Sequence, residues 1–280
     1  MWTNDDEAAG NGLDDDGNGY VDDRHGYDFS LSSPATDGTS PAHGTFVAGI
    51  IAGDGTGGIV TGVAPRTRIM PLVAGGFVEV ALALEYAIEN GADVVNMSFS
   101  IPGEGNLRGA WRMMSDHAVA AGLVLVSGAG NFRLSAPVPV RLRTPEDIPS
   151  VIAVGGVDAS LNLVPFSSTG PVEWGSVVFY GDHPLPGGLV KPDVVAFPGA
   201  GYPILDPAGG YIDPNDGIRG NSFSGPQASG AAALLLGARP GLPAWRVAEI
   251  LRESARDILP VGKDNDTGAG LIDLEAALRL

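Results

Sequence analysis

Hydrophobic residues along the chain form two kinds of run, which predict two kinds of secondary structure. Short, almost uninterrupted apolar runs are typical of buried strands, and they occur at residues 67–73, 92–98, 122–127, 150–157 and 192–197. Longer runs with helical spacing predict helices at residues 45–53, 80–90, 107–122, 225–238 and 244–257. Because strands and helices alternate, the sequence predicts an α/β fold in which helices cover both faces of a mainly parallel sheet.

The alternation continues without a break that would divide the chain into domains. Its 280 residues suit one large α/β domain, and the sequence has no linker-like segment or internal repeat. A proline-rich stretch at residues 135–149 is predicted to be a surface excursion within that domain. We therefore expect a single domain over residues 1–280.

Charge and composition exclude several classes of binding partner for this protein. The formal net charge is −17, and the only lysines are Lys191 and Lys263. Nucleic-acid binding needs clustered basic side chains, so we expect no nucleic-acid partner; the acidic balance suits an extracellular or cation-binding protein. The absence of cysteine excludes disulfides and thiol catalysis. No apolar run reaches the roughly 18 residues of a membrane span, so we expect no membrane partner.

Candidate chemistry begins with the segment GNSFSGPQASGAAALLL at residues 220–236. Ser222 follows a glycine and precedes a helical pattern of small residues. A serine beside a helix N-terminus lies near the positive end of the helix dipole and near free N–H groups, which suits a nucleophile that passes through an oxyanion. A helix-capping serine is the commoner role, and this segment alone does not decide between the two.

Two further segments place a polar residue among small ones. His43 in PAHGTFVAGIIAG stands at the start of a predicted helix, where an imidazole can act as a general base. Asn131 follows the predicted strand in LVLVSGAGN, where a side-chain amide can donate to an oxyanion. Taken singly, a capping histidine and a turn asparagine are the commoner explanations.

Taken together, the three segments resemble the subtilisin-like serine proteases, or subtilases. HGTFVAGIIAG is similar to the family's HGTxVAG motif, GNSFSGPQASG to its GTSMAAPHVAG motif, and SGAGN to the segment with its oxyanion asparagine. The resemblance covers nearly the whole chain and implies a three-layer subtilisin-like fold and a secreted serine endopeptidase that hydrolyses polypeptides. It implies that Ser222 is the nucleophile, His43 the general base and Asn131 the oxyanion donor.

The resemblance also indicates where a substrate binds. NMSFSIPG is similar to the family's NMSLGG segment, which pairs with substrate and lines the specificity pocket. The expected substrate-binding residues are Ser98, Phe99, Ser100 and Gly128. Ser100 and Ile101 stand where the family usually has two glycines, so the side-chain preference does not follow from the family. Asn221 and Gln227 also depart from the serine motif, but neither is a reacting position.

The aspartate of the family's triad has no counterpart in this sequence. Subtilases carry it in a D-[ST]-G motif that ends the first core strand, before the histidine. Here TDGTS at residues 36–40 follows no strand, and Asp28 in GYDFS matches a structural part of the family pattern. We therefore expect a fold that lacks its first core strand and a chain that is weakly active or inactive alone.

Three explanations of the missing aspartate remain open. In the first, this sequence is an N-terminally truncated form of a longer protein, and the strand and an inhibitory propeptide belong to its upstream segment. Alternatively, the chain is a non-catalytic pseudoprotease that binds peptides by strand addition, or half of a split protease that a separate peptide completes. Loss of a central strand would leave two neighbours unpaired in the core, which favours the first explanation.

The acidic segment DDDGNGYVDD at residues 14–23 has the rhythm of a calcium-binding loop. Oxygen ligands at alternate residues can wrap one Ca²⁺ ion, and Gly19 takes the position of the sharp turn. The expected ligands are Asp14, Asp16, Asn18, the Tyr20 carbonyl and Asp22. His25 replaces the bidentate glutamate of a complete EF-hand. A solvated acidic turn is the alternative, but clustered carboxylates repel without a cation, and similar segments in subtilases are associated with calcium.

Overall fold

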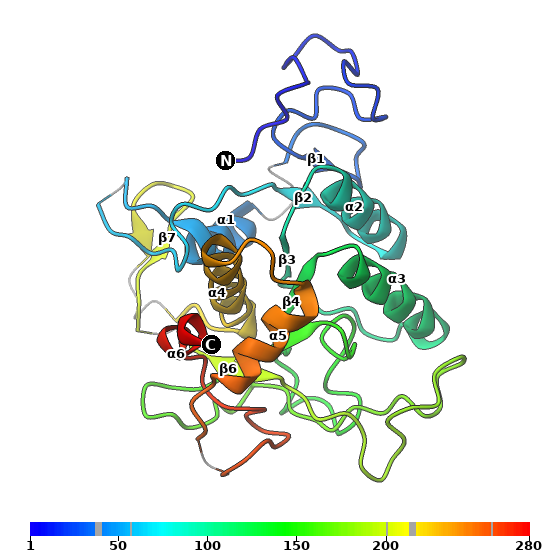
Figure 1. Cartoon of the computed structure of the whole chain (residues 1–280), viewed down its shortest axis with the longest axis vertical. Helices are drawn as coiled ribbons and strands as arrows, with labels where there is room; N and C mark the ends of the chain where they lie inside the picture. Colours follow the sequence, from blue (N-terminus) through cyan, green and yellow to red (C-terminus); the bar gives the residue numbers. More distant parts are fainter. Residues whose placement is uncertain (37–40, 57, 200, 213–216, 259) are drawn as a thin grey trace.

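The computed structural model describes residues 1–36, 41–56, 58–199, 201–212, 217–258 and 260–280 (Figure 1). Its α-helices are α1 (Pro41–Ala52), α2 (Phe77–Glu89), α3 (Arg108–Ala120), α4 (Gly225–Ala238), α5 (Ala244–Glu253) and α6 (Leu274–Arg279). Its strands are β1 (Tyr27–Asp28), β2 (Leu72–Val73), β3 (Val94–Met97), β4 (Val124–Gly128), β5 (Ile152–Gly156), β6 (Val194–Ala196), β7 (Ile204–Leu205) and β8 (Tyr211–Ile212). Two 3₁₀ helices, η1 (Gly105–Leu107) and η2 (Asn221–Phe223), precede α3 and α4. Every helix and strand predicted from the sequence overlaps one of these elements.

Four parallel strands form the main sheet, in the order β3–β4–β5–β6. The register places Val94 opposite Val124 and Val154 opposite Val194. β1 and β2 form a separate parallel pair, and β7 and β8 form an antiparallel hairpin. Among the described helices, none combines the length and apolar character that a membrane span requires.

The two faces of the main sheet contact different helices. On β4, Leu125 belongs to a core that includes side chains of α2 and α3, whereas Val124 and Val126 belong to a core with α4 and α5. This separation follows from the alternation of side chains along a strand. Figure 1 shows α2 and α3 together on one side of β4, and α4 with α5 on the other. The predicted three-layer α/β architecture is therefore confirmed.

The parallel strands are interrupted between β2 and β3. These strands are consecutive in the chain, yet β2 pairs only with β1 and β3 only with β4 among the described residues. Leu72, Val94 and Val95 beside the interruption are partly exposed, whereas every residue of β4, β5 and β6 is buried. Among the described residues, β2 and β3 thus each have one edge without a strand partner.

The prediction of a surface excursion at residues 135–149 was wrong for its second half. Val138 and Val140 are exposed, but Leu142, Glu146 and Ile148 are buried. Polar and proline-rich composition suggested solvent, but the second half packs into the interior beside the Ser100 side chain and the α3 core. Composition does not reveal this because buried acids with partners look like surface acids in a sequence.

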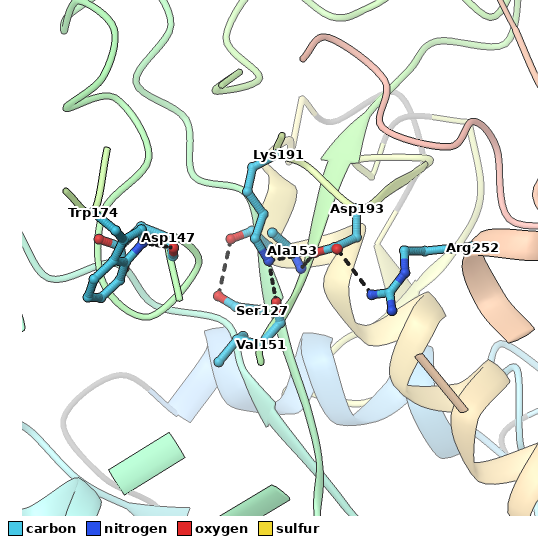
Figure 2. Close-up of polar contacts among 9 residues, drawn as sticks. Ser127, Asp147, Val151, Ala153, Trp174, Lys191, Asp193 and Arg252 are labelled. Carbon is cyan, nitrogen blue, oxygen red and sulfur yellow. Dashed lines mark hydrogen bonds and ion pairs between the residues drawn. The ribbon is translucent and has the colours of Figure 1, made fainter. Parts of the chain in front are cut away.

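A buried ion pair ties β5, β6 and α5 together (Figure 2). Lys191 Nζ lies 2.6 Å from Asp193 Oδ2 and donates to the Val151 carbonyl at 2.5 Å. Asp193 also accepts from Ala153 N at 2.9 Å and contacts Arg252 at 3.3 Å. Burial raises the pKa of Asp193, but Lys191 and Arg252 outweigh this and hold it below its ordinary value. One of the two lysines of this acidic chain is therefore an interior residue.

Candidate active site

Ser222 lies in η2, directly before α4 and next to the end of β4. Ser224, not Ser222, occupies the N-cap position of α4, so helix capping does not explain Ser222. Its side chain is half-buried, with Oγ 3.5 Å from the Ser98 carbonyl. A Cβ at Gly225 would come within 2.9 Å of Gly128 N. The glycine lets the start of α4 approach β4 closely, and this approach brings Ser222 to the strand end.

Asn131 is fixed beside Ser222 by a backbone contact. Its Oδ1 accepts a hydrogen bond from Asn221 N at 2.8 Å, which leaves its Nδ2 group available to donate elsewhere. Asn221 is fully buried, and its own amide donates to the Gly130 carbonyl at 2.8 Å and to Ser167 Oγ at 3.0 Å. Sequence reasoning treated Asn221 as a departure from the motif. Asn221 joins the serine segment to the loops that carry Gly130 and Ser167. The hydrophobic pattern of the sequence gives no indication of these contacts.

His43 is the third residue of α1 and lies beside the serine segment. Its ring centroid is 5.9 Å from the ring of Phe223, the residue after Ser222. Burial lowers the pKa of His43 below its ordinary value of 6.5, so the imidazole is neutral and able to accept a proton near pH 7. Within the described ranges no hydrogen bond joins His43 to Ser222. Such contacts are often loose in a free enzyme and tighten with substrate.

One cavity of about 120 Å³ brings most of the predicted site together. It is lined by Ser98, Phe99, Ser100, Gly128, Gly130, Asn131, Phe132 and Ser222. All four predicted substrate-binding residues thus lie around the same space as the predicted nucleophile and oxyanion donor. Gly128 must be small here, because a Cβ on it would come within 2.2 Å of the Asn221 carbonyl oxygen.

Among the described residues no carboxylate acts on the His43 ring, and burial is the cause that lowers its pKa. Asp28 is buried on β1, where its Oδ1 accepts from the backbone N–H groups of Ser30 and Leu31. Its role is that of a turn-forming residue. Residues 37–40 of the TDGTS segment lie outside the described residues.

The acidic loop brings two of the predicted calcium ligands together with a residue that sequence reasoning missed. Carboxylate oxygens of Glu7, Asp14 and Asp16 lie within 4.8 Å of one another. The Asn18 amide donates to Asp16 at 3.0 Å, whereas the Asp22 carboxylate accepts from two backbone N–H groups of the loop. Glu7 precedes the alternating pattern by seven residues, so that pattern could not identify it.

The same loop is anchored to the body of the protein by aromatic side chains. The Tyr20 ring packs edge-on against Tyr27, Phe29 and Tyr86, with ring centroids 4.9, 5.4 and 5.3 Å apart. Tyr86 Oη in turn donates to Asp23 Oδ2 at 2.6 Å. Figure 1 shows the N-terminal loop at one end of the molecule, beyond β1 and α2. The Tyr20 side chain therefore fixes the loop on α2.

Comparisons with known proteins identify the family. The Subtilase family (Peptidase_S8) matches residues 5–270. The chain is similar to subtilisin DY of Bacillus licheniformis, with 33% identity over 249 residues that cover 86% of this chain and 78% of that protein. It is 29% identical to fervidolysin of Fervidobacterium pennivorans over 90% of this chain, but spans only 36% of that protein. The crystal structure of fervidolysin, described as a keratinolytic enzyme related to subtilisin, matches with a TM-score of 0.69 and 27% identity over 91% of this chain and 39% of that chain. The chain belongs to the subtilase family of serine peptidases.

Proposed function

We propose that this chain provides the nucleophile, general base and oxyanion donor of an endopeptidase. The observation that carries the proposal is the cavity that Ser222 and Asn131 share with Ser98, Phe99 and Ser100. A candidate nucleophile, an amide donor and a strand end surround a space that a residue of a polypeptide substrate can enter. Membership of the subtilase family supports the same reaction class.

In the proposed reaction, Ser222 Oγ attacks the peptide carbonyl while His43 accepts its proton. His43 then returns the proton to the leaving amine. In the second half of the reaction, water attacks the acyl-enzyme with His43 again as the base, and the acyl group is released from Ser222. Asn131 Nδ2 and the Ser222 backbone N–H donate to the tetrahedral oxyanion. The hydrogen bond from Asn221 N to Asn131 Oδ1 supports this role, because it orients the amide before substrate arrives.

The proposed triad needs an acid that the described residues do not supply next to His43. We propose that an extended apolar strand carrying this acid pairs between β2 and β3. The unpaired edges of these two strands among the described residues and the partial exposure of Leu72 and Val95 support the location. The strand can come from an upstream segment, which can also include a propeptide. It can equally come from a separate peptide.

Hydrolysis of casein and labelling of Ser222 by a fluorophosphonate test this proposal. We expect the 280-residue chain to react slowly, and the chain extended by a strand that carries the acid to react about 10⁴-fold faster, a magnitude measured in another serine protease. Ser222→Ala should abolish both signals. An extended, folded chain that neither hydrolyses casein nor reacts with the probe would refute the endopeptidase assignment.

A non-catalytic peptide-binding module is the second candidate function. The absence of a described carboxylate beside His43 favours it, and β3 has an open edge that can pair with a peptide. This alternative predicts peptide binding without hydrolysis, even when the strand is supplied. The same casein assay separates the two candidates.

We further propose that the acidic loop holds a structural Ca²⁺ ion. The donor set fits this ion, because Glu7, Asp14 and Asp16 offer hard carboxylate oxygens within 4.8 Å of one another. Glu7 is only 1% exposed and its two oxygens accept backbone N–H groups of Asp15 and Asp22. These bonds hold the carboxylate in place, and a divalent cation would offset repulsion within the cluster.

The remaining parts of the proposal concern setting and scope. We propose that residues 1–280 act as one domain that works outside the cell on polypeptide substrates. Family membership and the net charge of −17 support this setting.

A further inference from the structure

A fully buried carboxyl group lies behind the wall of the Ser222 cavity. Glu146 has no exposed surface. Its Oε1 accepts a hydrogen bond from Ser100 Oγ at 2.7 Å and from Arg143 N at 3.1 Å. Its Oε2 is buried and has no hydrogen-bond partner among the described residues. A buried polar atom without a partner destabilises a protein, so this oxygen calls for a functional explanation.

Two of the residues that line the cavity bring Glu146 close to it. The Ser100 hydroxyl group contacts the carboxyl group directly. Gly130 also lines the cavity, and because it has no side chain only its backbone lies between Glu146 and the cavity. A Cβ on Gly130 would come within 2.7 Å of Glu146 Oε1, so a larger residue there would displace the acid. Gly130 has φ +80°, a conformation that favours glycine.

The hydrogen bond to Glu146 also fixes how Ser100 can interact with a ligand. A hydroxyl group has one proton to donate, and Ser100 gives it to the carboxyl. Toward the cavity the Ser100 oxygen is therefore an acceptor. A ligand side chain that ends in an N–H group can donate to the Ser100 oxygen. An acidic side chain would instead face this oxygen, which is an acceptor, with the Glu146 carboxyl group behind it.

The size of the cavity favours a slim side chain. A cavity of roughly 150 Å³ holds one benzene ring, and this one measures about 120 Å³. Phe99 and Phe132 add apolar surface that can cover a methylene stem. The Arg143 guanidinium lies 3.4 Å from the centre of the Phe132 ring, where the aromatic face stabilises the cation.

We propose that Ser100, positioned by Glu146, makes the Ser222 cavity selective for a basic substrate residue, lysine above all. In this arrangement Ser100 accepts from the ammonium group, and Glu146 holds the Ser100 hydroxyl proton away from the cavity. Glu146 is a positioning residue, because Ser100 and Gly130 stand between it and the ligand. The inference rests on the proposed function, since it assumes that the cavity receives a residue of a polypeptide.

Equilibrium binding tests this selectivity without requiring turnover. The probes are fluorescein-labelled Ala-Ala-Pro-Xaa peptides with Lys, Phe or Glu at the C-terminal position, measured by fluorescence anisotropy on the 280-residue chain. We expect the Lys peptide to bind about tenfold more tightly than the Phe peptide, as one hydrogen bond to a charged group provides, and the Glu peptide to bind most weakly.

Variants separate positioning from general structure. Glu146→Gln keeps an uncharged acceptor for Ser100, and we expect it to keep the Lys-to-Phe preference. Glu146→Leu removes the acceptor and frees the Ser100 hydroxyl proton to point into the cavity, and we expect the preference to fall to less than about threefold. Ser100→Gly should also lower the preference, whereas replacing the partly exposed α5 residue Glu249 by Gln should leave it unchanged. Loss of fold would change all three affinities together, not their ratio.

The results also separate this inference from the endopeptidase proposal. Ser222→Ala should bind the Lys peptide normally even though it cannot hydrolyse casein. Selective binding by a chain that does not hydrolyse casein even when the missing strand is supplied would support the cavity and refute the catalytic assignment. Equal affinity for the three peptides, or the absence of binding, would overturn the inference. A preference for the Glu peptide would also overturn it and would indicate that Arg143 dominates the cavity.

Discussion

Protonation of Glu146 makes a quantitative prediction for the stability of the fold. Burial raises the pKa of Glu146 to about 8, from an ordinary value of 4.5. Between these values the folded chain holds a proton that the unfolded chain has released. The contribution is therefore fully present below pH 4.5 and is lost as the pH rises through about 8.

The magnitude follows from the difference between the two pKa values. At about 1.4 kcal/mol for each pH unit, a difference of about 3.5 corresponds to about 5 kcal/mol of unfolding free energy. Between pH 5 and pH 8 the titration covers about 3.5 kcal/mol of this difference, and we expect a measured loss of about 2–3.5 kcal/mol, because water penetration relaxes buried charges. This loss is large beside the 5–15 kcal/mol that typically separates folded from unfolded states.

Urea unfolding at pH 5 and pH 8, followed by the fluorescence of the buried Trp111 and Trp174, measures this effect. Burial also raises the pKa of Asp147, although Arg108 opposes this, so the wild-type protein loses further stability over the same range. Glu146→Gln cannot ionise but keeps Asp147, and the difference between its pH dependence and that of the wild type isolates Glu146.

Glu249→Gln is the matched control, because Glu249 is a partly exposed glutamate on α5. Its stability should follow the wild-type pH dependence within about 0.5 kcal/mol. If wild type and Glu146→Gln lost equal stability between pH 5 and pH 8, Glu146 would be ionised in the folded chain, and the reasoning from burial would be wrong.

Three further predictions address the interior, the oxyanion donor and the acidic loop. Lys191→Met leaves the Asp193 charge without its buried partner and should lower the unfolding free energy by about 3–5 kcal/mol in urea titrations; a loss below about 1 kcal/mol would contradict the described contacts. Asn131→Ala should slow fluorophosphonate labelling of Ser222 by about 10²–10³-fold, a magnitude taken from a member of the same family, while the chain stays folded. Calcium should raise the melting temperature and EDTA lower it, and Glu7→Gln should weaken calcium binding in calorimetry; no heat and no thermal effect would rule out the calcium site.

The local parts of the structure could be predicted from the sequence because they depend on short patterns. Apolar runs located β3 to β6, and small residues beside Ser222 and His43 indicated the loop and helix that carry them. The grouping of Ser98, Asn131 and Ser222 around one cavity followed from the family resemblance, since nothing local relates residues that are far apart in the chain.

Two groups could not be predicted because their surroundings come from distant parts of the fold. Glu146 lies in a proline-rich stretch whose composition suggests solvent, and its partner Ser100 is 46 residues away. Glu7 lies outside the alternating pattern of the loop and meets Asp14 and Asp16 only after the chain folds back. Burial of an acid depends on such contacts, and hydrophobic periodicity does not record them.

The interruption between β2 and β3 affects how copies of the chain behave in solution. An open strand edge is a template for pairing with another chain, and the partly exposed Val94 and Val95 make the β3 edge adhesive. The net charge of −17 keeps copies apart, but at 0.1 M salt that repulsion reaches only about 10 Å. Whether copies of the chain stay apart therefore depends on the balance between like-charge repulsion and pairing through the β3 edge. A strand bound in the gap would remove this edge and with it the tendency to associate.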